Sequence, residues 1–249
     1  MKNKQIIINN LLISYFEQNG FKKPVLVFLH GWRSNKENWL SLLKELKDYS
    51  TYVLDLPGFG ASQTQGKTFS LDEYSKIVEQ FIEKLKLQNV ILVGHSFGGA
   101  IATKLVLKSK LISKLILIDS SGLRSKTAKK TVLKSVSKLA KPLFTLPFMK
   151  PLRTQIYEKL GWDDYLATPK LRQSYLAIIK EDLKPMLQLI KQPTLLIWGE
   201  NDQDTPTTDA NIFRKSISKS DLKIVKDAGH YSFLDQPQVV AQFIQNFID

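Results

Sequence analysis

The pentapeptide Gly-His-Ser-Phe-Gly at residues 94–98 lies between an apolar run at residues 90–93 and a helix-like run at residues 100–107. A buried strand that breaks sharply into a helix at a G-x-S-x-G sequence is the setting of a nucleophile elbow. The turn is so tight that side chains two residues before and after the serine would collide, and glycine at both places removes the clash. The hydroxyl of Ser96 then stands at the carboxyl end of a strand, beside helix N–H groups that favour negative charge. This is where a nucleophile for acyl transfer should lie.

The pentapeptide alone is weak evidence for a nucleophile, because Gly and Ser are common residues. Strand-like and helix-like stretches alternate on both sides of it. Two β-like runs at residues 4–9 and 11–16 meet at an Asn-Asn pair that tolerates the positive φ angles of a tight hairpin. Further strands are expected at residues 25–29, 51–54, 90–93, 114–119, 194–198 and 222–225, and helices at residues 38–47, 71–85, 100–107 and 239–248. This alternation predicts an α/β fold, in which helices cover both faces of a mostly parallel sheet and the site lies at the carboxyl ends of the strands.

The alternation stops at residues 121–122 and resumes only with the strand at residues 194–198. Segments in between, such as residues 131–139 and 171–189, have helical periodicity. An all-helical insertion between two strands of one sheet is best interpreted as a cap over the carboxyl ends of the strands. We therefore expect one core formed by residues 1–122 and 191–249, with a helical cap, or lid, at residues 123–190.

Composition and motifs argue against several kinds of site. The chain has no cysteine and only three histidines, which excludes disulfides and thiolate catalysis and disfavours a metal site. Gly58-Phe59-Gly60 begins like a dinucleotide-binding G-x-G-x-x-G motif, but residue 63 is Gln and a polar loop follows instead of a helix. The sequence also lacks the phosphate-binding G-x-x-x-x-G-K-[ST] motif. We expect neither a metal nor a cofactor.

The net charge of +13 is concentrated in the predicted cap. Residues 123–191 hold 15 Lys or Arg against 5 Asp or Glu, and residues 124–141 hold seven positive charges and no negative one. Four lysines are spaced to line one helical face: Lys130, Lys134, Lys138 and Lys141. Two interpretations stay open. The lysines form the solvated face of a lid helix, or they make a basic amphipathic lid that contacts an anionic membrane surface or attracts acidic substrates.

The rest of the chain gives expectations about location and partners. The apolar run at residues 6–8 is interrupted by Asn9-Asn10 and is followed by no small-residue cleavage site, so it is interpreted as a strand. No apolar run approaches the roughly 20 residues that span a bilayer. We expect a soluble, cytoplasmic protein that acts on a small molecule and not on nucleic acid. The oligomeric state stays open.

His230 is the predicted general base for Ser96, since a serine hydroxyl is a poor nucleophile until a base takes its proton. It follows the last predicted strand, which places it on the same edge of the sheet as the serine. His30 and His95 are poorer candidates, because His95 is adjacent to the serine and must point elsewhere. The base needs an acid to fix its tautomer, and Asp202 is preferred for this role, with Asp119 at the end of the preceding strand as the alternative.

The predicted oxyanion hole consists of two backbone N–H groups, which a tetrahedral intermediate requires. One belongs to Phe97, directly after the nucleophile, and the other to Trp32 in the loop after the early strand. Gly31 lets that loop approach closely.

Five stretches, in this order, resemble the successive motifs of α/β-hydrolase-fold enzymes: Leu-His-Gly-Trp at 29–32, Asp-Leu-Pro-Gly-Phe-Gly at 55–60, Gly-His-Ser-Phe-Gly-Gly at 94–99, Trp-Gly-Glu-Asn-Asp at 198–202 and Ala-Gly-His at 228–230. The resemblance covers nearly the whole chain and implies a serine hydrolase with Ser96, Asp202 and His230 as its triad. It strengthens Asp202 over Asp119. The chain looks most similar to the capped branch that contains carboxylesterases and carbon–carbon bond hydrolases.

We expect cleavage of carboxylic esters through an acyl-enzyme, on a small-molecule substrate with an apolar acyl part that the stretch at residues 142–149 could help to bind. A carbon–carbon bond hydrolase, a thioesterase or a lactonase would use the same triad. A protein of another class, which binds a ligand with slow or no turnover, has the same fold. Dehalogenases and epoxide hydrolases of this fold use an Asp nucleophile, and Ser96 argues against both.

Overall fold

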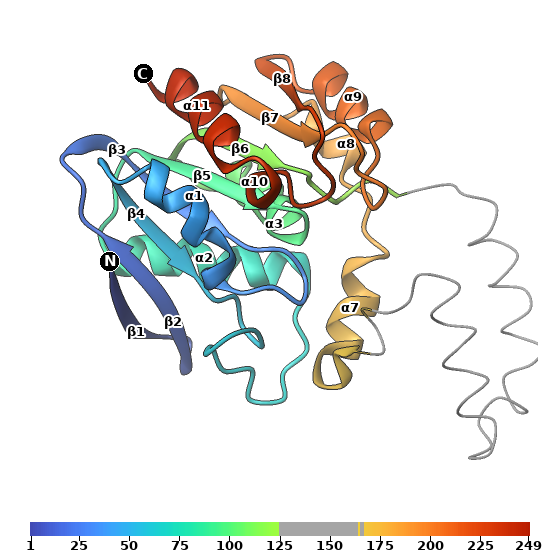
Figure 1. Ribbon diagram of the computed structural model, residues 1–249. Helices are drawn as coiled ribbons and strands as arrows, with labels where there is room; N and C mark the ends of the chain where they lie inside the picture. The colour runs from blue at the N-terminus through green and yellow to red at the C-terminus, as the bar shows by residue number, and fades with distance from the viewer. Residues whose placement is uncertain (125–163, 165–166) are drawn as a thin grey trace, which may run out of the picture.

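The computed structural model describes residues 1–124, 164 and 167–249. The predicted helix at residues 131–139, the apolar stretch at 142–149 and all of the basic run at 124–141 except Arg124 lie outside the described residues. The described part is an eight-stranded sheet with helices on both faces (Figure 1).

The strands are β1 (Lys2–Ile8), β2 (Leu11–Gln18), β3 (Lys22–Leu29), β4 (Tyr49–Leu54), β5 (Val90–His95), β6 (Ile112–Ile118), β7 (Thr194–Gly199) and β8 (Ser220–Val225). The described helices are the 3-10 turn η1 (Lys36–Trp39), α1 (Leu40–Glu45), α2 (Leu71–Lys84), α3 (Phe97–Val106), the 3-10 turn η3 (Pro169–Leu171), α7 (Arg172–Ile178), α8 (Lys184–Leu187), α9 (Thr207–Ser216), α10 (Ser232–Asp235) and α11 (Pro237–Ile248). None of these described helices combines the length and the apolar character needed to cross a lipid bilayer.

The sheet is antiparallel at one edge and parallel elsewhere, with the strand order β1-β2-β4-β3-β5-β6-β7-β8. Asn9 and Asn10, between β1 and β2, have φ angles of 48° and 64°, so the predicted tight hairpin is confirmed. From β4 to β8 every neighbouring pair runs parallel, which brings the carboxyl ends of these strands to one edge. The predicted α/β fold with a mostly parallel sheet is therefore confirmed.

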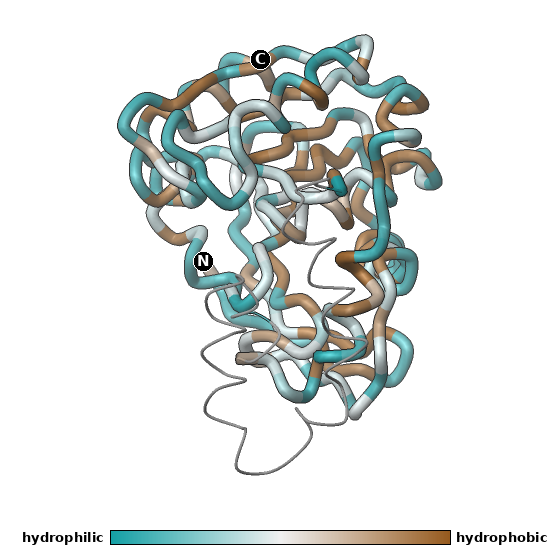
Figure 2. Tube along the Cα trace, turned by 90° about the vertical axis from the view of Figure 1, so that its right-hand side faces the viewer, coloured by the Kyte–Doolittle hydropathy of each residue, from teal (hydrophilic) through white to brown (hydrophobic). Residues whose placement is uncertain are grey.

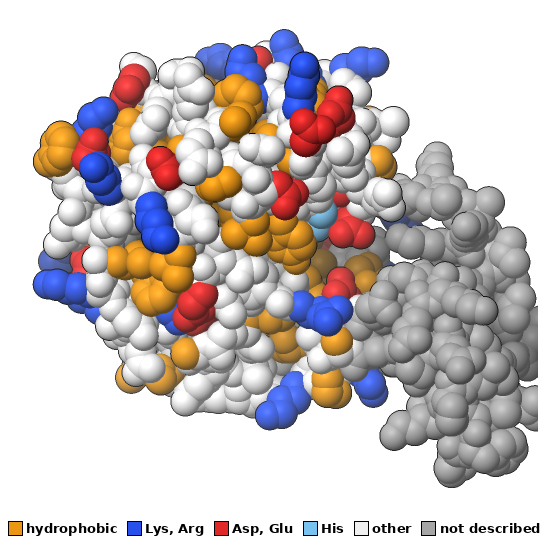
Figure 3. Space-filling view, viewed as in Figure 1, with side chains coloured by type: hydrophobic (Ala, Val, Ile, Leu, Met, Phe, Trp, Pro, Cys, Tyr) orange, Lys and Arg blue, Asp and Glu red, His pale blue; other side chains and the backbone are white. Residues whose placement is uncertain are grey.

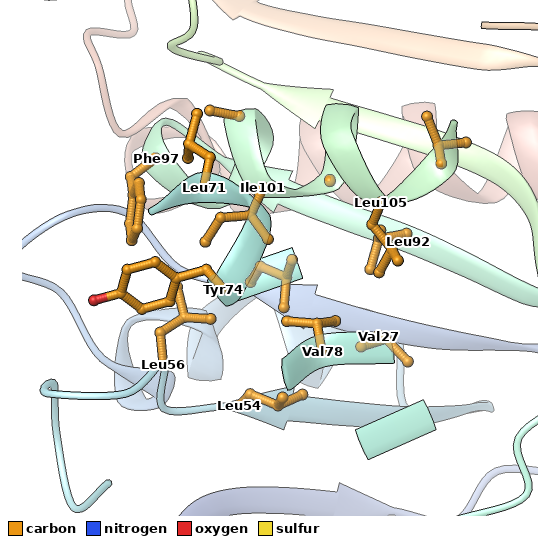
Figure 4. Packing of buried hydrophobic residues seen from close by; sticks show 14 of the residues in the cluster. Val27, Leu54, Leu56, Leu71, Tyr74, Val78, Leu92, Phe97, Ile101 and Leu105 are labelled. Carbon is orange, nitrogen blue, oxygen red and sulfur yellow. The ribbon is translucent and has the colours of Figure 1, made fainter. Parts of the chain in front are cut away.

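Two apolar cores fill the space between the sheet and its helices. Successive residues of a central strand face opposite sides, so Phe28 of β3 belongs to the core beneath α1, α10 and α11, whereas Val27 and Leu29 belong to the core beneath α2, α3 and α9. Figure 4 shows the second core, where Phe97 of α3 lies beside Tyr74 of α2. Apolar segments run through the interior of the molecule and hydrophilic loops lie around it (Figure 2).

Three predicted helices have different bounds in the structure. The helix expected at residues 38–47 is divided into η1 and α1, and α3 begins at Phe97, directly after the turn. The helix expected at residues 171–189 is divided into α7 and α8. Pro185 in the first turn of α8 cannot continue a helix from α7, and at the break the N–H of Leu183 donates to the carbonyl of Gly122 at 2.8 Å while the Leu183 side chain is buried. Helical periodicity does not reveal such a contact.

A buried ion pair joins the loops that follow β3 and β4. Lys36 Nζ lies 2.6 Å from Asp55 Oδ2, and the two side chains are 2% and 0% exposed. The Lys36 backbone N–H donates to Asp55 Oδ1 at 2.8 Å, and the Ala61 N–H donates to Oδ2 at 3.0 Å. Removing two charges from water is costly, so such a pair needs hydrogen bonds to all its polar atoms. The Asp55 carboxylate therefore connects the loop that carries Trp32 to the loop at residues 55–60.

We expect Asp55→Ala to lower the free energy of unfolding by about 3–5 kcal/mol, because it leaves the Lys36 charge buried without this partner. Asp221→Ala is the control, since it removes an ion pair in which Lys223 and Asp221 are 42% and 60% exposed. The control should cost less than about 1 kcal/mol. Urea unfolding followed by circular dichroism measures both losses. Equal losses in the two variants would contradict a structural role for the buried pair.

Candidate active site

Ser96 occupies a strained turn between β5 and α3. Its backbone has φ 49° and ψ −115°, outside the range that non-glycine residues usually adopt. A β-carbon on Gly94 would lie 2.4 Å from the Gly98 carbonyl oxygen, and one on Gly98 would lie 2.2 Å from the carbonyl oxygen of Leu29. Only glycine fits at both positions. The structure therefore gives the steric reason for the G-x-S-x-G pattern, and adds that the second glycine makes room for the end of β3.

His230 and Asp202 form a hydrogen-bonded chain with Ser96. His230 Nε2 lies 3.0 Å from Ser96 Oγ, and His230 Nδ1 lies 2.9 Å and 3.1 Å from the two carboxylate oxygens of Asp202. The Asp202 side chain is fully buried, whereas that of His230 is 13% exposed. A histidine side chain is visible among carboxylates on the face drawn in Figure 3. The geometry gives His230 an Nδ1–H that donates to Asp202 and a free Nε2 lone pair that faces the serine hydroxyl.

Asp202 is held by donors from its own loop as well as by His230. The N–H groups of Asp204 and Thr205 donate to Asp202 Oδ1 at 2.9 Å and 3.0 Å, and the Thr205 hydroxyl donates to Oδ2 at 2.7 Å. Burial raises the pKa of Asp202, but the hydrogen bonds from His230 and Thr205 outweigh burial and hold the pKa below its ordinary value. The carboxylate is therefore ionised and fixed in place beside the imidazole.

The pKa of His230 is shifted in the opposite direction. Burial lowers it, but the hydrogen bond to Asp202 and the negative charge of that carboxylate outweigh burial, so the pKa lies above its ordinary value. Asp204 and Asp119 add smaller effects of the same sign. Such an imidazole is a stronger base than a free histidine and is well suited to take up a proton from the serine.

Asp119, the alternative acid, binds other groups. Its Oδ1 accepts a hydrogen bond from the Gly199 N–H at 2.7 Å, and its Oδ2 accepts hydrogen bonds from the N–H and the hydroxyl of Ser232 at 3.1 Å and 2.6 Å. Burial raises its pKa to about 7, although these hydrogen bonds favour the ionised form. The Asp119 carboxylate thus connects the end of β7 to the start of α10. Asp202 is the carboxylate that contacts His230.

The other two histidines are buried and join separate loops. His30 Nδ1–H donates to the Gly31 carbonyl at 2.7 Å, and its Nε2 accepts a hydrogen bond from the Leu56 N–H at 2.9 Å. His95 Nε2–H donates to the His230 carbonyl at 2.7 Å. Burial lowers the pKa of His30 to about 4 and that of His95 to about 3, so both are neutral. Sequence reasoning treated them only as weaker bases and missed these contacts, whose one sequence signal is their position beside a motif glycine or serine.

Trp32 and Phe97, the predicted oxyanion-hole residues, lie next to each other at the carboxyl ends of the strands. Their ring centroids are 5.1 Å apart, and a β-carbon on Gly31 would lie 3.4 Å from Ser96 Cβ. The Trp32 ring also packs edge-on to Phe59 at 4.9 Å and at a tilt to Tyr175 at 5.4 Å. The loop after β3 therefore touches the strained turn, and an aromatic cluster borders it. Phe59 and Tyr175 were not singled out from the sequence.

One group in the described part of the chain has the donor atoms of a metal site. Ligand atoms of Asp202, Asp204 and His230 lie within 4.8 Å of one another. Two of the three residues already bind each other, because His230 Nδ1 donates to the Asp202 carboxylate. A metal ion at this place would compete with the hydrogen bond that orients the imidazole toward Ser96.

Comparison with known proteins agrees with this architecture. A family model with the description "Alpha/beta hydrolase family" matches residues 26–243. Monoacylglycerol lipase ABHD6 of Homo sapiens is 28% identical in an alignment 255 positions long, which covers 91% of this chain and 75% of the lipase. The structure of a membrane phospholipase A, reported as a bacterial virulence factor, has a TM-score of 0.81 at 25% identity and covers 100% of this chain and 86% of that one.

An esterase from Exiguobacterium antarcticum has a TM-score of 0.78 at 24% identity, over 99% of both chains. At this identity the similarity supports the fold and not the activity. The family match extends over most of the sequence and includes the strained turn at Ser96, the parallel strands and the loops that hold Asp202 and His230. This protein belongs to the alpha/beta hydrolase family and is a hydrolase of the esterase and lipase type.

Proposed function

We propose that this hydrolase cleaves carboxylic esters through an acyl-enzyme formed on Ser96. The observation that carries the proposal is the hydrogen-bonded chain from Ser96 Oγ through His230 to Asp202, with distances of 3.0 Å and 2.9 Å. These hydrogen bonds connect a nucleophile to a base, and the base to an acid that orients it, which is the arrangement that acyl transfer requires. Similarity to a monoacylglycerol lipase and a membrane phospholipase A supports an ester as substrate.

In the proposed reaction Ser96 Oγ attacks the ester carbonyl carbon while His230 Nε2 takes the hydroxyl proton. The carbon–oxygen bond to the alcohol then breaks, and His230 returns the proton to the leaving oxygen. Asp202 holds the imidazole in the Nδ1–H tautomer and stabilises the imidazolium. A water molecule, deprotonated by the same histidine, then attacks the acyl-enzyme. The bond between the acyl carbon and Ser96 Oγ breaks, the carboxylic acid is released, and His230 returns the proton to Ser96 Oγ. No step needs an electron acceptor or a second substrate besides water.

The negative charge that develops on the carbonyl oxygen would be stabilised by the backbone N–H groups of Trp32 and Phe97. Phe97 is the first residue of α3, where helix N–H groups lack intrahelical partners. The loop that carries Trp32 passes close to the nucleophile, since a β-carbon on Gly31 would lie 3.4 Å from Ser96 Cβ. Preorganised donors of this kind contribute about 10²–10³-fold each to the rate of acyl transfer.

The acyl part of the proposed substrate is apolar. The four rings of Trp32, Phe59, Phe97 and Tyr175 pack together, Phe97 directly follows Ser96 in the chain, and three of the rings belong to the core described above. Aromatic side chains supply large apolar contact areas with few polar groups. An alkyl chain is therefore better matched to this region than a charged acyl group.

We expect Ser96 to react covalently with a fluorophosphonate probe, and Ser96→Ala to abolish both the labelling and the hydrolysis of a chromogenic ester. The rate should fall by several orders of magnitude, because the nucleophile itself is removed. Mass spectrometry of the labelled peptide identifies the residue. A label on another serine would exclude Ser96 as nucleophile.

A chain-length series of chromogenic esters, run beside a thioester and a ring-fission diketone, tests the substrate class. Faster turnover of the esters than of the thioester and the diketone supports the proposal. Tight ligand binding without turnover of any ester would instead indicate a binding protein.

We expect Asp202→Asn to slow ester hydrolysis by about 10⁴-fold, because an amide favours the wrong tautomer of His230. Asp119→Asn is the matched control, since it changes a carboxylate of the same edge that contacts Gly199 and Ser232 instead of His230. Its effect on the rate should be much smaller. Steady-state kinetics on variants with unchanged circular dichroism measure both effects. A larger loss in Asp119→Asn would assign the orienting acid to Asp119.

We expect kcat/KM for a neutral ester to fall as the pH decreases through the pKa of His230, because only the neutral imidazole accepts a proton. Asp202 raises this pKa, so the midpoint should lie above about 6.5, the ordinary value for histidine. Burial holds the pKa values of His30 and His95 far below this range. Asp119, with a pKa of about 7, is the group that could be confused with His230. The transition should therefore persist in Asp119→Asn, and its disappearance there would assign it to Asp119.

A further inference from the structure

His95, the residue directly before the nucleophile, is the last residue of β5 and is 1% exposed. Its Nε2 lies 2.7 Å from the carbonyl oxygen of His230. A carbonyl oxygen only accepts hydrogen bonds, so the proton must be on His95 Nε2. The residue beside the nucleophile thus binds the backbone of the proposed base.

This hydrogen bond closes a ring of covalent and hydrogen bonds around the site. The ring runs from Ser96 Oγ to the His230 side chain, through the His230 carbonyl to His95 Nε2, and back along the chain to Ser96. In a closed ring the distance between Ser96 Oγ and His230 Nε2 depends on every other link. When one link is removed, that distance is no longer fixed.

Two backbone N–H groups close to His230 in the chain are held by carboxylates and not by His95. The N–H of Gly229 donates to Asp235 Oδ2 at 2.8 Å, and the N–H of Ser232 donates to Asp119 at 3.1 Å. Among the described residues, His95 is the one whose side chain hydrogen-bonds the backbone of residue 230.

Packing fixes the His95 ring in the orientation that this hydrogen bond needs. The ring centroid lies 4.9 Å from those of Tyr231 and Phe233 and 6.4 Å from that of Trp39. On the Nδ1 side, a β-carbon on Gly31 would lie 2.8 Å away, so the loop that carries Trp32 touches the same ring. In the described part of the chain Nδ1 has no hydrogen-bond partner. The ring therefore contacts all three segments proposed to form the active site and has one way to hydrogen-bond.

We propose that His95 is a positioning residue, which holds the backbone of His230 so that its Nε2 meets Ser96 Oγ. The inference rests on the proposed ester hydrolysis. His95 acts through His230: it hydrogen-bonds the backbone carbonyl of His230, and its ring packs against the imidazole with the centroids 5.0 Å apart. Its loss should therefore reduce kcat and leave KM nearly unchanged, since small misplacements of a catalytic group reduce the rate more than they reduce binding.

Two substitutions of equal length separate the hydrogen bond from the packing. His95→Gln keeps an N–H donor at the end of the side chain, whereas His95→Met has a similar length and no donor. We expect kcat of His95→Gln to stay within about 5-fold of the native protein and kcat of His95→Met to fall by about 10²-fold, with both KM values within about 2-fold. The rate of fluorophosphonate labelling should follow kcat. Equal melting temperatures of the two variants show that the difference does not come from folding. Equal kcat values in the two variants would overturn the proposal.

A measurement on the native protein needs no variant. The chain has three histidines, so ¹⁵N spectra of histidine side chains are simple to assign. His95 should be neutral in the Nε2–H tautomer from pH 5 to 8, while His30 has the Nδ1–H tautomer. An Nδ1–H tautomer for His95, or its titration in this range, would exclude the hydrogen bond to the His230 carbonyl. If the native protein fails to hydrolyse any ester, the proposed function fails, whereas the spectra still test the contact of His95.

Discussion

The backbone of Ser96 is held in a sparsely populated conformation, with φ 49° and ψ −115°, that costs a non-glycine residue about 1–3 kcal/mol. The surrounding sheet offsets this cost. The Ser96 N–H donates to the Ile118 carbonyl at 3.1 Å, and the Ser121 N–H donates to the Ser96 carbonyl at 3.1 Å. The strand that ends in this turn, β5, lies between β3 and β6 in the middle of the sheet. The position of the nucleophile is therefore a property of three paired strands, and the pentapeptide only makes it sterically feasible.

Three carboxylates follow the ends of strands β4, β6 and β7, and each has different partners. Asp55 binds the ammonium group of Lys36, Asp202 binds the imidazole of His230, and Asp119 binds neutral donors of Gly199 and Ser232. Without a cation, burial raises the pKa of Asp119 to about 7, whereas hydrogen bonds hold the pKa of Asp202 below its ordinary value. The end of a strand thus fixes where a carboxylate lies, and the groups that bind the carboxylate determine how its pKa is shifted.

Sequence reasoning predicted that Ser96 and His230 lie at one edge of the sheet, because each follows an apolar strand and the carboxyl ends of parallel strands meet at one edge. The residues alone left Asp119 and Asp202 as alternatives, since both follow neighbouring strands. The choice depends on a loop conformation that brings Thr205 and His230 to one carboxylate. The contacts of His95 and of Leu183 were likewise hidden, because they join residues far apart in the chain. Local patterns specify the elements, and long-range hydrogen bonds specify how the loops between them are held.

Strands β6 and β7 pair directly, with Leu115 opposite Thr194, although residues 119–193 separate them in the chain. The hydrogen bond between Leu183 and Gly122 brings the two ends of the intervening segment together at the sheet. All strands of the sheet, together with Ser96, Asp202 and His230, lie outside residues 123–182. We therefore expect the strand pairing to tolerate insertions in the middle of this segment, because a loop whose two ends lie close together can change in length without moving the strands that it joins. Its described end is tied more closely to the core, since Tyr175 packs against Trp32 and the Phe69 N–H donates to Ser174 Oγ.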